Sequence, residues 1–218
     1  MKYPCLVLDH DDTFVQTQKT TGYPYFKEYI ERVRPGIKLS FGEYARVCND
    51  AVFSDMCRQQ WNLTEEELNE EYLGWNAYSR CHIPEIYPGM DRLIRRQRAE
   101  GGIICVASMS ITEIIERDYL HHVGFLPGMI YGYDLPPEKR KPSSFALEDI
   151  MRRFGLKPEQ LLVVDDMMQG WTMASRVGVP TAFAGWSKAD FPEYKGNMQK
   201  HCTYTFDTPA DFEGFLFE

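Results

Sequence analysis

The sequence has no apolar run long enough to cross a lipid bilayer, and it has no excess of basic residues. Its 32 aspartates and glutamates outnumber its 24 lysines and arginines, which gives a net charge of −8. A membrane-spanning helix requires about 20 consecutive apolar residues, and a nucleic-acid surface requires a basic patch. We therefore expect neither a membrane nor a nucleic acid among the partners of this protein.

Cysteine is sparse, and the six cysteines are scattered without the spacing of metal ligands. Cys5 and Cys105 lie within strand-like apolar runs, where a reduced thiol packs as a small hydrophobic side chain. The first residues lead directly into such a run and leave no room for a signal peptide. These features predict a cytoplasmic protein. Because no sustained heptad pattern is present, we also expect a monomer.

Strand-like and helix-like segments alternate regularly from residue 86 onward. With 218 residues, 44% of them hydrophobic, the chain can form one large domain or a main domain with a smaller one. The alternation predicts an α/β fold with a doubly wound, Rossmann-like parallel sheet. The expected strands are 5–8, 103–107, 129–131, 161–164, 180–184 and 203–206, and the expected helices are 91–100, 111–123, 145–154, 171–177 and 209–215.

The segment 16–85 differs in composition from the rest of the chain, because it is rich in aromatic residues, glutamate and arginine and has no plain strand run. We expect helices over 25–33, after Ser40, and from Thr64 to about Arg80, where Thr64 and Glu67 have the spacing of a capping box. A connection of this length exceeds what a simple loop needs. The pattern therefore predicts an all-helical subdomain at 16–85, inserted into an α/β core made of 1–15 and 86–218.

Two carboxylates one residue apart, Asp9 and Asp11, directly follow the first apolar run. Open α/β sheets bind ligands at the carboxyl ends of their strands. The two acids would repel each other unless positive charge lay between them, and Mg²⁺, which takes oxygen ligands, would supply it. His10 is expected to point away from them, since side chains alternate along a strand. Taken alone, such a pair could equally be a solvated acidic turn.

Polar residues also follow later strands. Ser108 follows the strand 103–107, and Asp165 and Asp166 follow the strand 161–164. Lys141 lies in the sequence between these two strands. Each has an ordinary structural interpretation, since serine and aspartate cap helices and most lysines are solvated at the surface. Because parallel strands end at one edge of a sheet, however, these distant side chains can converge.

Together these residues resemble the motifs of the haloacid dehalogenase-like phosphohydrolases. The first motif of that family is an apolar strand followed by Asp-x-Asp-x-Thr, which Asp9, Asp11 and Thr13 match. The second is a strand ending in serine or threonine, which Ser108 matches, and the third is a lysine often followed by proline, which Lys141 matches. The resemblance covers essentially the whole chain, including a helical cap inserted after the first motif.

The fourth motif is an acidic pair after a strand, which Asp165 and Asp166 match. The segment from Asp165 to Gly170 is most similar to the version found in the β-phosphoglucomutase-like and phosphoglycolate phosphatase-like members. Four motifs in order at strand ends are far more specific than any one of them.

The resemblance implies a Mg²⁺-dependent phosphatase that hydrolyses a small phosphorylated metabolite through an aspartyl-phosphate intermediate. Asp9 would be the nucleophile, and Asp11 would protonate the leaving oxygen and then activate water. Ser108 and Lys141 would bind the phosphoryl group and complete the catalytic set.

The resemblance also implies the metal ligands. Mg²⁺ would be held by Asp9, by the main-chain carbonyl of Asp11, and by the pair Asp165 and Asp166.

Two positions depart from the family pattern. Asp12 stands where family members usually have glycine, and Met109 stands where a small polar residue is common. Two alternative functions remain open at this point. One is a sugar phosphomutase of the same family, which has the same four motifs. The other is a non-catalytic regulator that binds phosphate, for which the two departures would be signs of decay.

Overall fold

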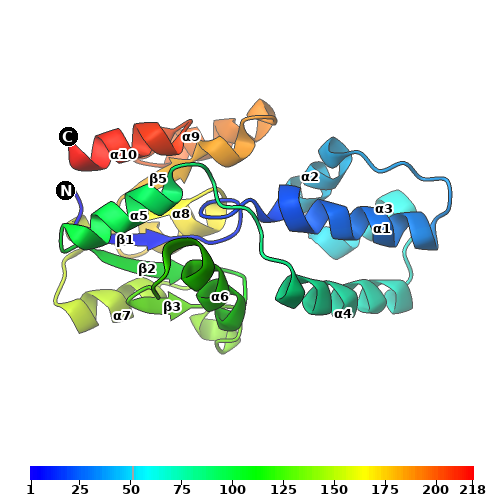
Figure 1. Ribbon diagram of the computed structural model, residues 1–218, viewed down its shortest axis with the longest axis horizontal. Helices are drawn as coiled ribbons and strands as arrows, with labels where there is room; N and C mark the ends of the chain where they lie inside the picture. Colours follow the sequence, from blue (N-terminus) through cyan, green and yellow to red (C-terminus); the bar gives the residue numbers. More distant parts are fainter. Residues whose placement is uncertain (51) are drawn as a thin grey trace. The chain divides into compact units, whose positions relative to one another are not determined.

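The computed structural model of the protein describes residues 1–50 and 52–218, and these form two units (Figure 1). The sheet unit comprises Met1–Val15 and Ile86–Glu218, and the helical unit comprises Gln16–Glu85. Among the described residues, no helix combines the length and the apolar character needed to cross a bilayer.

All strands of the sheet unit pair in parallel, which confirms the predicted doubly wound α/β fold. Their order across the sheet is β3-β2-β1-β4-β5-β6, so the first strand lies at the centre. The strands are β1 (Cys5–Leu8), β2 (Ile103–Ala107), β3 (Met129–Tyr131), β4 (Leu161–Asp165), β5 (Thr181–Ala184) and β6 (Tyr204–Phe206).

Helices cover both faces of this sheet, as the apolar run of β1 requires. Cys5 and Val7 pack in one cluster with residues of α7 (Phe145–Phe154) and α8 (Met168–Ser175). Leu6 and Leu8 pack in the opposite cluster with residues of α5 (Met90–Ala99), α6 (Thr112–Val123) and α10 (Pro209–Phe217). All four β1 side chains are fully buried, because alternate residues of a central parallel strand face two different helix layers.

The expected strands agree with the structure to within one residue, and most helices do so to within two. The helix predicted at 171–177 begins earlier, since α8 starts at Met168, immediately behind the acidic pair. The Asp165 carboxylate accepts a hydrogen bond from the Met167 backbone N–H, which satisfies a donor at the entry to this helix. One helix of the sheet unit, α9 (Lys195–His201), was not predicted, because its short polar sequence buries only Met198.

The helical unit contains a single-turn π-helix, η1 (Gln18–Gly22), followed by α1 (Tyr23–Val33), α2 (Phe41–Asp50), α3 (Phe53–Trp61) and α4 (Glu65–Cys81). Its core is one cluster of apolar and aromatic side chains that includes Phe26, Ile30, Val47 and Trp61. Helix α3 was not predicted. The predicted capping box at the start of α4 is present. The Thr64 hydroxyl accepts a hydrogen bond from the Glu67 N–H, and the Glu67 carboxylate accepts one from the Thr64 N–H.

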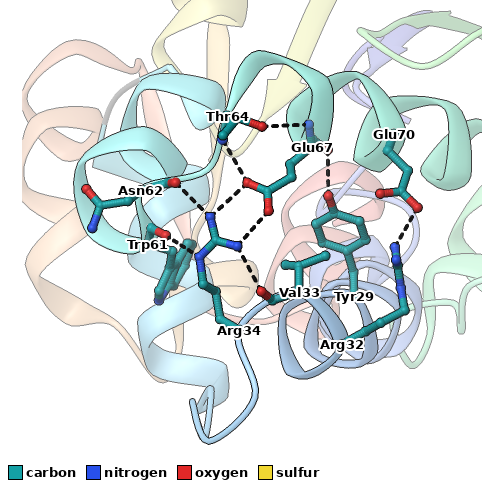
Figure 2. Close-up of polar contacts among 9 residues, drawn as sticks. All are labelled: Tyr29, Arg32, Val33, Arg34, Trp61, Asn62, Thr64, Glu67 and Glu70. Carbon is teal, nitrogen blue, oxygen red and sulfur yellow. Dashed lines mark hydrogen bonds and ion pairs between the residues drawn. The ribbon is translucent and has the colours of Figure 1, made fainter.

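Arg34, at the C-terminal end of α1, connects three helices of this unit (Figure 2). Its guanidinium nitrogens lie 2.6 and 2.8 Å from the two carboxylate oxygens of Glu67 on α4. The same group donates hydrogen bonds to the main-chain carbonyls of Val33, Trp61 and Asn62, so it also contacts the C-terminal end of α3. The hydrogen bond from Arg34 lowers the pKa of Glu67 to about 2. Arg32 and Glu70, by contrast, form an exposed ion pair nearby.

We predict that Arg34→Lys lowers the melting temperature of the helical unit by several degrees. A lysine ammonium has three donors and cannot reproduce the planar fork that bonds Glu67 and the backbone carbonyls together. Thermal unfolding followed by circular dichroism measures the effect. Arg32→Lys is the matched control, because an exposed pair contributes little, and equal losses in the two variants would contradict the prediction.

Glu71 is a carboxylate buried in the helical unit, on the face of α4 that packs toward the unit's interior. Burial raises its pKa from 4.5 to about 7. A carboxyl group with a raised pKa in the folded state binds its proton more tightly there than in the unfolded chain. Its contribution to stability is therefore complete below pH 4.5 and is lost as the pH rises to about 7.

We predict that Glu71→Gln stabilises the protein by roughly 1–3 kcal/mol at pH 8, because the neutral amide avoids the cost of burying a charge. At pH 5 the gain should largely disappear, since Glu71 is then protonated. Urea unfolding at both pH values measures the difference. Glu66→Gln, at an exposed position of the same helix, should change neither value, and a gain of equal size at pH 5 would contradict the assigned cause.

Candidate active site

The carboxyl ends of the central strands bring the chemistry-bearing residues to one edge of the sheet. Asp9 follows β1, and its backbone N–H still donates to the carbonyl of Val164 in β4. Asp165 is the last residue of β4, and Asp166 follows it. Parallel pairing of β1 with β4 places these strand ends side by side, as the sequence predicted they would be.

Three carboxylates gather at this edge, from Asp9, Asp165 and Asp166. Their side chains are almost completely shielded from solvent, with residue exposures of 6%, 2% and 4%. One oxygen from each lies within 4.8 Å of the others. Three negative charges this close together and this well buried would be strongly unfavourable without positive charge among them.

Two buried lysines supply such charge. The Lys141 ammonium lies 2.9 Å from Asp9 Oδ1 and also forms an ion pair with Asp165. The Lys188 ammonium lies 2.7 Å from Asp166 Oδ2. Lys141 precedes α7, and Lys188 ends the short 3₁₀-helix η4 (Gly185–Lys188) that follows β5. Every carboxylate of the cluster therefore has an ammonium partner.

These charges shift the protonation equilibria of the cluster. Burial raises the pKa of Asp9 well above its ordinary value; Lys141 opposes the rise, and the neighbouring carboxylates add to it. The pKa of Asp165 is raised for the same reasons, with burial as the largest cause. Burial alone would lower the pKa of Lys141, but the carboxylates of Asp165 and Asp9 outweigh it and raise the pKa overall. More positive charge would thus favour the ionised form of Asp9.

Asp11 is turned toward the loop after β2. Its Oδ2 accepts a hydrogen bond of 2.5 Å from the hydroxyl of Ser110. The Ser110 N–H in turn donates to the Oγ of Ser108, which is buried. Two serines, rather than Ser108 alone, therefore connect the second strand to the first.

The turn after Asp11 explains one of the two departures from the family pattern. Asp12 has φ = +54°, a left-handed conformation that glycine adopts easily and other residues adopt at some cost. The turn is closed by a hydrogen bond from the Asp12 N–H to the Val15 carbonyl. The Trp186 indole N–H also donates to the Thr13 carbonyl and fixes the turn to the segment after β5.

His10 points away from its two acidic neighbours. Its Nε2 lies 3.0 Å from Asp118 Oδ2, and both side chains are fully buried. Arg117 makes an ion pair with the same carboxylate at 2.6 Å. This chain of polar contacts fixes the backbone between Asp9 and Asp11 to α6.

Position 170, in α8, requires glycine because the helix backbone there passes very close to the acidic cluster. A Cβ atom there would lie 2.1 Å from the Oδ2 of Asp165. Only glycine lets α8 pack this tightly behind the carboxylate, which accounts for the glycine at the end of the fourth motif.

The predicted site residues thus fall into two groups. Asp9, Lys141 and Asp165 are joined by direct ion pairs, and Asp166 lies in the same cluster. Asp11 and Ser108 are joined through Ser110 instead. Lys188 and Ser110 were missed: a lone lysine after β5 and a second serine after β2 form no recognisable motif.

The donor set suits a divalent cation. Carboxylate oxygens are the ligands that Mg²⁺ prefers, and the Asp9, Asp165 and Asp166 oxygens are close enough to share one ion. Lys141 contacts Oδ1 of Asp9, and Lys188 contacts Oδ2 of Asp166, so each of these carboxylates retains a second oxygen for a metal.

Comparisons with known proteins identify both a family of hydrolases and solved structures with a similar fold. A family model described as haloacid dehalogenase-like hydrolase matches residues 3–178. No curated protein matches the chain in sequence.

Solved structures resemble the chain over nearly its whole length. A predicted phosphoglycolate phosphatase from Haemophilus somnus is 19% identical, with a TM-score of 0.72 and 99% of each chain covered. A haloacid dehalogenase-like protein from Agrobacterium tumefaciens is 15% identical, with a TM-score of 0.78, covering 98% of this chain and 97% of its own. CbbY from Rhodobacter sphaeroides, in complex with xylulose 1,5-bisphosphate, is 15% identical, with a TM-score of 0.66 and 94% of each chain covered. At these identities the likeness shows the fold.

We predict that Lys141→Met destabilises the metal-free protein by roughly 3–5 kcal/mol at pH 8, because it leaves two buried carboxylates without their ammonium partner. Without Lys141 the pKa values of Asp9 and Asp165 rise further above those of the unfolded chain. The loss should therefore shrink at pH 5, where these groups bind protons in the folded state. Urea unfolding at the two pH values measures it. Lys157→Met, an exposed lysine of the same unit, is the control, and an equal loss at both pH values would contradict the prediction.

Proposed function

Because the chain belongs to the haloacid dehalogenase-like hydrolase family, we propose that it is a Mg²⁺-dependent phosphatase acting on a small phosphorylated metabolite. One observation carries the proposal: the buried carboxylate of Asp9 lies 2.9 Å from the Lys141 ammonium, inside a cluster of acids that can hold a cation. A carboxylate oriented in this way can attack phosphorus, whereas a purely structural ion pair would not require two further acids beside it.

Asp9 is the nucleophile in this proposal. Its carboxylate attacks the phosphorus of the substrate, the bond from phosphorus to the leaving oxygen breaks, and an aspartyl phosphate forms. Lys141 holds one oxygen of Asp9 and so limits the rotation of the carboxylate. The same ammonium reduces the repulsion between Asp9 and the incoming phosphate.

Asp11 serves as the general acid and then the general base. Its proton passes to the leaving oxygen in the first step, and in the second step the ionised carboxylate takes a proton from the water that cleaves the intermediate. The Ser110 hydroxyl, 2.5 Å from Asp11 Oδ2, holds this side chain in place for both transfers. Ser108 on the same loop binds a phosphoryl oxygen.

Asp9 and Asp166, with Asp165 beside them, would hold the metal ion, together with the main-chain carbonyl of Asp11. When bound, Mg²⁺ would offset the negative charge shared by the carboxylates and the phosphate. The geometry supports this assignment, since the cluster has three carboxylates and only two ammonium partners, from Lys141 and Lys188.

The alternative within the family is a phosphomutase that returns the phosphoryl group to a sugar. The same residues would form the aspartyl phosphate, so the two functions differ in the acceptor of the phosphoryl group. Incubation with a sugar bisphosphate distinguishes them: release of inorganic phosphate supports the phosphatase, and isomerisation without release supports the mutase.

We predict that Asp9→Asn reduces Mg²⁺-dependent hydrolysis of p-nitrophenyl phosphate by roughly 10³-fold or more, because the amide cannot form the phosphoenzyme. Steady-state turnover with and without a chelator measures it. Asp207→Asn, at an exposed position far along the chain, should retain full activity. If the unaltered protein with Mg²⁺ hydrolyses none of a broad panel of phosphate esters, the proposal fails and a regulator that binds phosphate without hydrolysing it is favoured.

A further inference from the structure

Lys188 is a buried ammonium at the acidic edge that no step of the proposed reaction uses. Lys188 is only 3% exposed, and its Nζ lies 2.7 Å from Asp166 Oδ2. A lysine is rarely buried unless it is paired, because removing an ammonium from water is costly. Its position at the end of η4, directly after β5, is fixed by the sheet, since β5 pairs with β4, the strand that Asp166 follows.

Further acidic residues lie near Tyr87, whose ring packs edge-on against Trp186 of the same short helix η4 that ends at Lys188. The nearby Tyr87 hydroxyl has a raised pKa, chiefly through burial but also through the charges of Asp12, Asp166 and Asp190. Asp12, which replaces the usual glycine of the first motif, therefore lies, like Asp166, close enough to Tyr87 to raise the pKa of its hydroxyl. A second buried cation in this region is what that charge requires.

Lys141 cannot meet this requirement, because its ammonium is already shared between Asp9 and Asp165. Each lysine has its own partners: Lys141 forms ion pairs with those two carboxylates, and Lys188 forms an ion pair with Asp166. Removing Lys188 would leave Asp166 as a buried charge without its ammonium.

A divalent cation bound to the other oxygen of Asp166 would lie close to the Lys188 ammonium. The two cations would repel each other across one carboxylate, in a site where low solvent exposure weakens screening. Lys188 and the metal ion thus stabilise the same carboxylate and oppose each other electrostatically.

We propose that Lys188 is a positioning residue that acts as a built-in counter-cation for Asp166: it stabilises the acidic cluster without metal and weakens the affinity of the cluster for Mg²⁺. This inference rests on the proposed function only in requiring that Mg²⁺ binds at Asp9 and Asp166. Its consequence is a site that folds without metal and exchanges the ion readily.

Calorimetric titration of the chelator-treated full chain with MgCl₂ tests the inference. We expect Lys188→Met to bind Mg²⁺ at least about tenfold more tightly than the unaltered protein, because a like charge has been removed beside the ion. Lys188→Arg keeps the charge and should bind within about threefold of the unaltered protein. Lys200→Met, an exposed lysine of α9, should not change the dissociation constant. Equal or weaker binding by Lys188→Met overturns the inference.

Lys188→Gln separates charge from orientation. The amide can still donate a hydrogen bond to Asp166, so a residue that only orients the carboxylate would be replaced without a change in affinity. We expect tighter Mg²⁺ binding in this variant as well, together with a lower melting temperature of the metal-free protein and a larger rise in melting temperature on adding Mg²⁺. An unchanged dissociation constant for Lys188→Gln overturns the charge-based role.

Folding of the variants is itself informative. If Lys188→Met and Lys188→Gln are unfolded without metal, recovery of the native circular dichroism spectrum at millimolar Mg²⁺ supports the inference, since the ion then replaces the ammonium. Failure to recover overturns it. These outcomes are independent of turnover: a chain that binds Mg²⁺ as expected but hydrolyses no phosphate ester contradicts the proposed phosphatase, not the role of Lys188.

Discussion

The structure of the sheet unit depends on one electrostatic constraint, which is that three carboxylates must share a buried edge. Asp9, Asp165 and Asp166 have oxygens within 4.8 Å of one another and almost no contact with solvent. Each is paired with an ammonium, from Lys141 or Lys188, and both lysines are themselves buried. Such an arrangement is costly to build, and it persists where the charges are needed for binding or chemistry.

The surrounding fold holds this cluster in place from several sides. His10 fixes the backbone between the first two acids through its contact with Asp118 on α6. Gly170 lets α8 pack directly against Asp165. Trp186 fixes the turn at Thr13 to the segment that also positions Lys188. The helical unit has a comparable centre in Arg34, whose guanidinium connects the ends of three helices.

Much of the fold could be predicted, because its local signals agree with its tertiary arrangement. The apolar run of β1 is buried on both faces, and the Thr64 capping box begins α4 as expected. The helices α3 and α9 were missed for a physical reason. Each is short and begins without a side-chain cap, so its stability comes from packing that the local sequence does not show. The early start of α8 also has a partner that the local pattern does not show, because the Asp165 carboxylate accepts from the Met167 N–H just before the helix.

The sequence by itself determined the strands, their alternation with helices and the seven residues that match the family motifs, because these depend on short-range patterns. Only the tertiary structure decided which side chains meet. It joined Asp11 to Ser110 and Asp166 to Lys188, pairs that lie 99 and 22 residues apart. No local pattern could reveal these pairs, because their partners come together only when β1, β2, β4 and β5 align in parallel and end at the same edge.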